Sequence, residues 1–201
     1  MLNILSLTGS PIKKGSTEIL LERIAGGIIE TYSHPAENAL VRLNDYQYIP
    51  CQSCGKSPEP DLCFFKDEIY PVYESLARAD VVLFGSPIYF DSVSGQAKLF
   101  IDRANCFRPY DFKGESEHTF KKIITEKRLG AMVLVGGERQ NFEPARVVIA
   151  GFFKWIEVLN CGLITCAGSS MEPGAAADDS DKMTEAYDLG CHIARRLPPN
   201  D

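Results

Sequence analysis

The chain has 201 residues, of which 45% are hydrophobic and 24% are charged, as expected for one globular domain spanning residues 1–201. The net charge of −6 argues against non-specific binding to nucleic acid or to an anionic membrane. The short basic pairs at 121–122 and 127–128 are expected on a solvated face. No apolar run is as long as a membrane span, and the N-terminal residues lack signal-peptide features, so we expect a cytoplasmic protein.

Apolar runs that predict strands alternate along the chain with amphipathic patterns that predict helices. The expected strands are residues 2–7, 39–43, 81–86, 131–136 and 162–167, and the expected helices are residues 18–31, 67–79, 94–105, 144–159 and 181–197. Most of the strand runs are continuously apolar, which is typical of parallel strands covered on both faces. This pattern predicts an α/β fold, flavodoxin-like with three α/β/α layers, and a five-stranded parallel sheet of order 2-1-3-4-5. In such a sheet, ligands bind beyond the carboxyl ends of the strands.

The loop after the first strand has the composition of a phosphate-binding loop. It offers glycines for close backbone approach, hydroxyl groups and positive charge, from Gly9, Ser10, Lys13, Lys14, Gly15, Ser16 and Thr17. The helix that follows presents unpaired N–H groups and the positive end of its dipole. The triphosphate pattern G-x-x-x-x-G-K-[ST] and the dinucleotide pattern G-x-G-x-x-G are both absent. A phosphate monoester is the expected ligand, and a capped turn without a ligand is the alternative.

A second motif follows the third predicted strand. Residues 85–103 read G-S-P-I-Y-F-D-S-V-S-G-Q-A-K-L-F-I-D-R. Together with the first loop, this segment resembles the NAD(P)H-dependent FMN reductase group of flavodoxin-like proteins. The patterns of that group run roughly G-S-P-R-x-x-G-N-T and S-P-x-Y-x-x-x-x-[ST]-x-x-x-K-x-[FL]-[IL]-D-R. The resemblance covers most of residues 1–160.

The resemblance implies an FMN site formed by these loops. It places Ser10, Ser16 and Thr17 on the phosphate, and it places the turn of residues 87–90 beside the flavin ring. That turn consists of Pro87, Ile88, Tyr89 and Phe90. A turn fixed by proline and bearing aromatic side chains suits a flat apolar ring, although simple core packing is the alternative for the two aromatic residues. Gly136 and Gly137, at the end of the fourth predicted strand, are expected to let the backbone approach the ring.

The phosphate loop departs from the family pattern at two positions. Ile12 stands where relatives usually have arginine, and Ser16 stands where they usually have asparagine. Lys13 or Lys14 is the candidate for supplying the missing charge, although a lysine lacks the two-pronged geometry of arginine. We therefore expect phosphate binding of reduced strength.

Three cysteines cluster in the loop after the second strand. Cys51, Cys54 and Cys63 match three of the four ligand positions that related iron-sulfur flavoproteins use for a [4Fe–4S] cluster, and Ser57 occupies the remaining position. Because a serine alkoxide is a poorer ligand for iron, three interpretations stay open: a metal-free loop, a cluster with three cysteine ligands, or a thiol pair that is redox-active or binds zinc. The other four cysteines, Cys106, Cys161, Cys166 and Cys191, are expected to be small buried hydrophobic residues.

The resemblance implies an FMN-dependent oxidoreductase that takes hydride from NAD(P)H, as co-substrate, and passes electrons to a small-molecule or protein acceptor. An iron-sulfur flavoprotein-like electron carrier and a non-catalytic flavodoxin-like binding module are the alternatives. No side chain is expected to act as a catalytic group, because the cofactor carries the chemistry. The helix expected at residues 144–159 is apolar almost all round, which predicts either a homo-oligomer interface, in a dimer or tetramer, or burial in the core. The long charged segment 107–128 is expected to be a lid, an insertion, an interface element or an irregular surface excursion.

Overall fold

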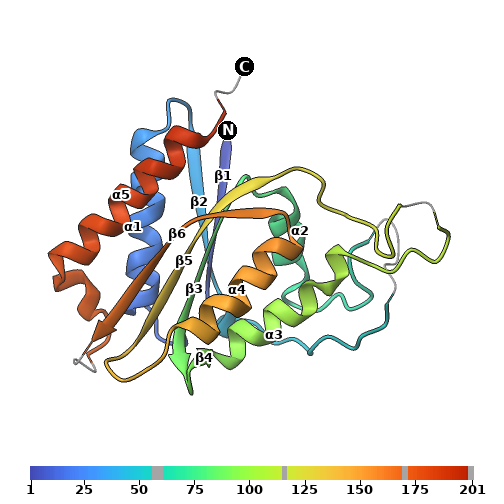
Figure 1. The fold of residues 1–201 in the computed structure, drawn as a ribbon, viewed down its shortest axis with the longest axis horizontal. Helices are drawn as coiled ribbons and strands as arrows, with labels where there is room; N and C mark the ends of the chain where they lie inside the picture. Colours follow the sequence, from blue (N-terminus) through green and yellow to red (C-terminus); the bar gives the residue numbers. More distant parts are fainter. Residues whose placement is uncertain (56–60, 115–116, 169–171, 199–201) are drawn as a thin grey trace.

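The computed structural model describes residues 1–55, 61–114, 117–168 and 172–198. Its elements are β1 (Leu2–Thr8), α1 (Ser16–Thr31), β2 (Ala36–Arg42), η1 (Leu43–Asp45), α2 (Tyr70–Arg78), β3 (Val81–Tyr89), β4 (Ser92–Val93), α3 (Gly95–Arg103), η2 (Ala104–Phe107), β5 (Arg128–Gly137), α4 (Glu143–Trp155), β6 (Val158–Gly168), η3 (Ala175–Asp178) and α5 (Ser180–Arg196). The main strands are parallel and lie in the order β2-β1-β3-β5-β6 (Figure 1). The predicted flavodoxin-like order is therefore confirmed.

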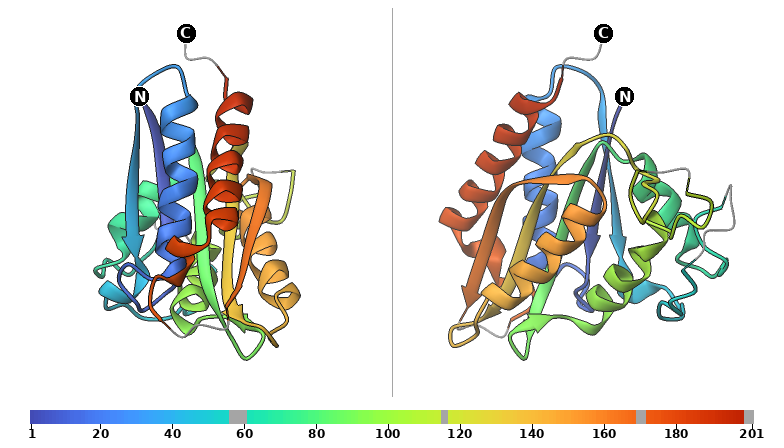
Figure 2. Two further views of the ribbon diagram at one scale, coloured as in Figure 1. Left: turned by 90° about the vertical axis from the view of Figure 1, so that its left-hand side faces the viewer. Right: turned by 45° about the vertical axis from the view of Figure 1, so that its right-hand side comes forward.

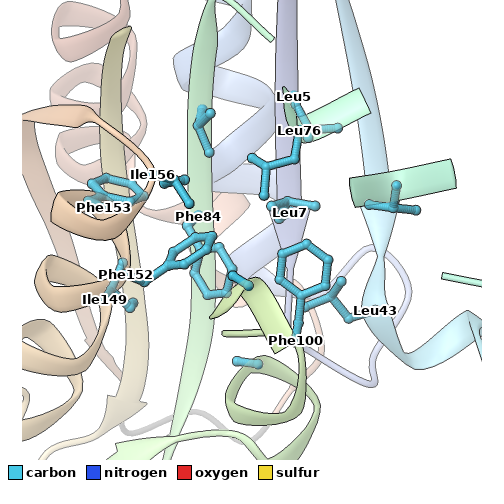
Figure 3. Close-up of a cluster of buried hydrophobic side chains, with 14 of the residues drawn as sticks. Leu5, Leu7, Leu43, Leu76, Phe84, Phe100, Ile149, Phe152, Phe153 and Ile156 are labelled. Carbon is cyan, nitrogen blue, oxygen red and sulfur yellow. The ribbon is translucent and has the colours of Figure 1, made fainter. Parts of the chain in front are cut away.

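Helices cover both faces of the sheet (Figure 2). Helices α1 and α5 pack on one face, where their apolar side chains meet alternate residues of the strands. Helices α2, α3 and α4 pack on the other face, around a cluster that includes Phe84 of β3, Phe100 of α3 and Phe152 of α4 (Figure 3). Because β1 and β3 contribute side chains to both clusters, their sequences are continuously apolar rather than alternating.

Glycines bring α1 and α5 into close backbone contact. A Cβ atom added at Gly27 of α1 would lie 2.3 Å from the carbonyl oxygen of Tyr187, and one added at Gly190 of α5 would lie 2.1 Å from that of Ile24. Only hydrogen atoms fit at these two positions, so this helix pair requires glycine at both.

The structure corrects several expected boundaries. Strand β3 continues to Tyr89 and pairs with the short antiparallel strand β4, a hairpin that the sequence did not predict. Helix α4 ends at Trp155, before the predicted residue 159, because Glu157 has a φ of +58° and β6 begins at Val158. Within the described residues, no helix is both long enough and apolar enough to cross a membrane.

Of the basic pair at 127–128, Lys127 is exposed as expected, but Arg128 does not lie on a solvated face. Arg128 is buried, and its guanidinium donates hydrogen bonds to the carbonyl oxygens of Leu76, Ala79 and Ile156. Burial lowers the pKa of Arg128 to about 10. Three carbonyl acceptors explain how the cation is tolerated in the interior.

One side of α4 is buried in the core, through residues such as Ile149 and Phe152, while Val147 is exposed. Core burial is thus established for that side, and a subunit interface on the other side stays a prediction. The described part of segment 107–128 contains a β-bridge between Tyr110 and Phe120 and packs against Trp155 at the end of α4.

Candidate functional site

The phosphate loop lies at the carboxyl end of β1 and is tied to its neighbours by backbone contacts. The Gly9 N–H donates to the carbonyl oxygen of Gly85, and the Ser94 hydroxyl donates to the carbonyl oxygen of Gly9 at 2.7 Å. A Cβ atom on Gly9 would meet Ala97 Cβ at 2.7 Å, so this position excludes larger residues. The loop is thereby held against the start of α3, whose N-cap is Ser94.

Helix α1 begins without a side-chain cap, because its N-cap residue is Gly15. The first hydrogen bond of the helix is donated by Ile19 N to Gly15 O. The backbone N–H groups of Ser16 and Thr17 lie in the first turn, so the helix offers them no carbonyl acceptor. Thr17 is buried, and its methyl group lies over Gly85. An anion at this position would complete the hydrogen bonding of the helix start.

The predicted phosphate ligands occupy different surroundings. Ser10 is buried and its hydroxyl oxygen accepts from Ile12 N, while the Ser16 hydroxyl oxygen accepts from Ala176 N of η3, so each retains an O–H that can donate. Lys13 is exposed and reaches Asp45 only at 4.0 Å, and Lys14 has a φ of +56°. Ile12 is exposed, so it offers apolar surface where relatives carry a cation.

The carboxylate of Glu18, in the first turn of α1 directly after the phosphate loop, is buried. Glu18 accepts two hydrogen bonds from Arg42, at 2.6 and 2.7 Å. The hydrogen bonds from Arg42 hold the pKa of Glu18 below its ordinary value, against the opposing effect of burial. Arg42 thus neutralises the acidic group in the first turn of α1, which keeps the loop suitable for an anion.

The predicted ring turn is a protruding hairpin beside the phosphate loop. Phe90 and Asp91 both have positive φ, of 51° and 56°, as a two-residue hairpin turn requires. Phe90 is fully exposed and Tyr89 is exposed, so core packing does not account for these aromatic residues. Ile88 is buried beneath Gly136. A bulky residue such as Phe90 at positive φ is strained, which is a frequent property of functional turns.

Gln140 joins this hairpin to the loop after β5. Its side chain accepts from Gly137 N at 2.6 Å and donates to the carbonyl oxygen of Ile88 at 3.0 Å. Asp91 strengthens the same connection by accepting from Asn141 N at 2.8 Å. The structure therefore brings together the loops that contain the predicted phosphate residues, residues 87–90, and Gly136 and Gly137.

A second candidate site lies at the other end of α3. A cavity of about 270 Å³ is lined by four cysteines together with two arginines and three aromatic side chains, and these residues are Cys51, Cys54, Cys63, Cys106, Arg103, Arg108, Phe65, Phe120 and Trp155. Figure 1 shows the loop between η1 and α2 beside the end of α3 that lies away from β4. The three cysteines predicted from sequence do come together, and Cys106 of η2 joins them. Ser57 lies outside the described residues.

Arg103 fixes both ends of the cysteine loop. Its guanidinium forms a two-pronged ion pair with Asp67 and donates to the carbonyl oxygens of Ile49 and Phe65. It also lies 3.9 Å from the sulfur of Cys63. Burial is the largest single effect and lowers the pKa of Arg103, but the hydrogen bonds and ion pair with Asp67, together with Tyr73 and Cys63, raise that pKa above its ordinary value. The cavity therefore contains a permanent, nearly buried cation.

Two N–H groups in the lining of the cavity are buried and unsatisfied. Arg103 Nε and Trp155 Nε1 have no hydrogen-bond partner among the described residues. Burial raises the pKa of the Cys106 thiol to about 12, and the neighbouring Cys63 and Cys51 add to this effect. None of the seven cysteines forms a disulfide bond. Within the described part of the chain, no three His, Cys, Asp or Glu side chains converge on a position for a single metal ion.

Sequence reasoning missed Cys106 and Gln140. Cys106 was expected to be a simple buried residue, but it contributes to the wall of the cysteine cavity. No spacing pattern connects it to the loop, because the juxtaposition arises from the packing of η2. The signal available in the sequence for Gln140 was its position shortly after the pair Gly136-Gly137. Its hydrogen-bond partner Ile88 in β3 is distant in sequence, so the contact itself gave no signal.

Comparisons with known proteins agree with this arrangement. The family model described as NADPH-dependent FMN reductase matches residues 2–162. An iron-sulfur flavoprotein of Archaeoglobus fulgidus is 36% identical over 124 residues, which is 62% of this chain and 59% of the relative. An iron-sulfur flavoprotein of Methanosarcina thermophila is 23% identical over 98% of this chain and 93% of the relative. The chain thus matches less than two thirds of the first relative and nearly all of the second.

Solved structures share the fold. An apo NADH:FMN oxidoreductase (EMOB) superposes with a TM-score of 0.66 at 14% identity, covering 100% of this chain and 92% of that one. A flavodoxin from the domain Archaea superposes with a TM-score of 0.56 at 14% identity, covering 97% of this chain and 98% of that one. At these identities the likeness establishes the fold. With the family match over residues 2–162, the chain belongs to the NADPH-dependent FMN reductase family and has a flavodoxin-like fold.

Proposed function

We propose that this protein is an NAD(P)H-dependent FMN oxidoreductase whose flavin lies across the carboxyl ends of β1, β3 and β5. The observation that carries the proposal is the uncapped start of α1, which follows a loop that Ser94 ties to the start of α3 beside the exposed aromatic hairpin. The chemistry that FMN supplies when bound is acceptance of hydride from a reduced nicotinamide and release of the electrons to an acceptor.

The residues of the chain would bind and orient this group. The O–H groups of Ser10, Ser16 and Thr17 and the first amides of α1 would hold the phosphate. The backbone of Gly136 and Gly137 and the apolar surface of Pro87 and Tyr89 would flank the ring, while Phe90 extends beyond them.

Flavin titration of two variants of Thr17 tests the phosphate site. Thr17→Val keeps the shape and removes the hydroxyl, so we expect the affinity for FMN to fall by about 1 to 2 kcal/mol, or roughly 5- to 30-fold in Kd. Thr17→Ser is the matched control and should remain close to wild type, because it retains the hydroxyl. Equal affinity in all three proteins would remove Thr17 from the site. A wild-type protein that takes up no FMN would overturn the proposal.

Anaerobic titration of the FMN-loaded protein with NADH and with NADPH tests the activity. Loss of the yellow flavin absorbance with either nicotinamide is the expected result. An unchanged spectrum with both would favour a flavodoxin-like carrier or binding module over a reductase.

The cysteine cavity supports a second proposed function, in which an iron–sulfur cluster at this site exchanges electrons with the flavin or with an acceptor. Several relatives are named iron-sulfur flavoproteins. In this chain, four thiols, the cation of Arg103 and two unsatisfied N–H donors surround one cavity. This donor set fits an anionic, sulfur-rich group.

A further inference from the structure

We propose that Cys106 is the fourth protein ligand of an iron–sulfur cluster in this cavity, together with Cys51, Cys54 and Cys63. The inference rests on the proposed cluster function. It replaces the sequence expectation that the ligand set is incomplete because a serine stands at position 57.

Cys106 lies in η2, the short helix that directly follows α3, and it lines the cavity. Its neighbour Asn105 donates toward the sulfur of Cys51 at 3.9 Å, and Arg103 donates toward the sulfur of Cys63 at the same distance. One short segment of chain therefore contacts two of the loop cysteines and places a third thiol in the same cavity wall. The position is supported by regular structure on its N-terminal side, so it does not depend on the loop alone.

The charges and dipoles around the cavity suit four thiolates. Arg103 and Arg108 bring two guanidinium groups to a wall that also holds the thiols, aromatic rings and the polar side chains of Gln52, Ser53 and Asn105. Arg108 is ion-paired with Glu157. Arg103 is itself buried and paired with Asp67, and its Nε points to no protein acceptor among the described residues. A neutral, apolar pocket would need neither this cation nor the unsatisfied Trp155 Nε1. Hydrogen bonds from such groups to cluster sulfur atoms are a known means of tuning iron–sulfur centres.

The arrangement of the thiols favours a cluster over a single metal ion. The described residues contain no group of three His, Cys, Asp or Glu side chains placed to hold a single ion, and four thiols, the usual number of ligands of a cubane cluster, line the cavity. Zinc bound by the pair Cys51 and Cys54 alone would leave two thiols and two N–H donors of the same cavity unused. Soft thiolate is also the ligand that iron–sulfur clusters select, in preference to a serine alkoxide.

Anaerobic reconstitution of the full chain with ferrous iron and sulfide tests the assignment. After removal of unbound ions, iron, acid-labile sulfide and FMN are quantified per chain, and the electron paramagnetic resonance spectrum of the dithionite-reduced protein is recorded. The variants are Cys106→Ala, Cys106→Ser and Ser57→Ala. Cys191→Ser is the matched control, because Cys191 is a buried cysteine that packs against Thr31 on the opposite face of the sheet.

We expect wild type, Ser57→Ala and Cys191→Ser to bind about four iron and four sulfide per chain. Cys106→Ala should retain roughly half of the iron or less, or hold a cluster that lacks one iron. Cys106→Ser should retain cluster with an altered spectrum, because a hard oxygen ligand replaces sulfur. Wild-type FMN content in both Cys106 variants would show that they are folded.

Three results would overturn the inference, and they are distinguishable. If both Cys106 variants bind wild-type amounts of iron and give the wild-type spectrum, Cys106 is not a ligand, and the proposed cluster function stands. If wild-type protein binds no iron and sulfide, or binds zinc without sulfide, the cluster function itself fails. A loss of cluster in Ser57→Ala but not in the Cys106 variants would assign the fourth position to the serine.

Discussion

Replacing Gly27 by alanine tests whether the α1–α5 contact determines stability. The added methyl group would lie 2.3 Å from the carbonyl oxygen of Tyr187, about 1 Å closer than an ordinary contact. A backbone carbonyl cannot rotate away, so we take the upper end of the range for overpacking, about 3 kcal/mol. The higher helix propensity of alanine, compared with glycine, stabilises the folded protein by about 1 kcal/mol and offsets part of this cost. The net expectation is a loss of about 2 kcal/mol in the free energy of unfolding.

The adjacent residue provides the control. A Cβ atom on Gly26, in the same helix, would meet no atom within 4 Å, so Gly26→Ala should gain about 1 kcal/mol from helix propensity alone. Urea denaturation of the flavin-free proteins, followed by circular dichroism, measures both values. The reasoning is refuted if Gly27→Ala is as stable as wild type, or if the two variants change stability equally.

Three further predictions concern the proposed flavin site. Glu18→Gln should lower stability at pH 7 by about 1 to 3 kcal/mol, because it weakens the hydrogen bonds from Arg42. The pKa of Glu18 is lowered in the folded state, so this difference should shrink as pH falls below about 4.5; a difference that is constant with pH would contradict the pairing. Gly9→Ala should weaken FMN binding about tenfold by displacing the phosphate loop, whereas Gly95→Ala, whose Cβ would meet no atom within 4 Å, should not. Gln140→Ala should destabilise the protein by about 1 to 2 kcal/mol through the loss of two hydrogen bonds, and an unchanged urea midpoint would argue against that connection.

The strand order was predictable because its signals are local. Continuous apolar runs such as the one in β3 indicate strands that are covered on both faces of the sheet. The rule that crossovers between parallel strands are right-handed then leaves few possible strand orders. The hairpin of β3 and β4 gave no such signal, since β4 has only two residues and the turn uses Phe90 and Asp91 at positive φ rather than glycine.

Features that depend on contacts between distant segments could not be predicted. Cys106 is separated in sequence from the cysteine loop, so no spacing motif includes it. Arg128 is one of two adjacent basic residues and resembles a solvated pair, but three carbonyl groups from other elements surround it. In both cases the residue type was visible, and its environment was determined by tertiary packing.

Helix α3 connects the two candidate sites directly. Ser94, its N-cap, donates to Gly9 of the phosphate loop, and Arg103, its last residue, lines the cysteine cavity. At 1.5 Å per residue, the nine residues of α3 span about 14 Å. Because Ser94 and Arg103 lie at the two ends of one helix, the number of residues in α3 fixes the distance between the Gly9 contact and the cavity wall at Arg103. Under the proposed function, this spacing contributes to the gap that electrons would cross between the two sites.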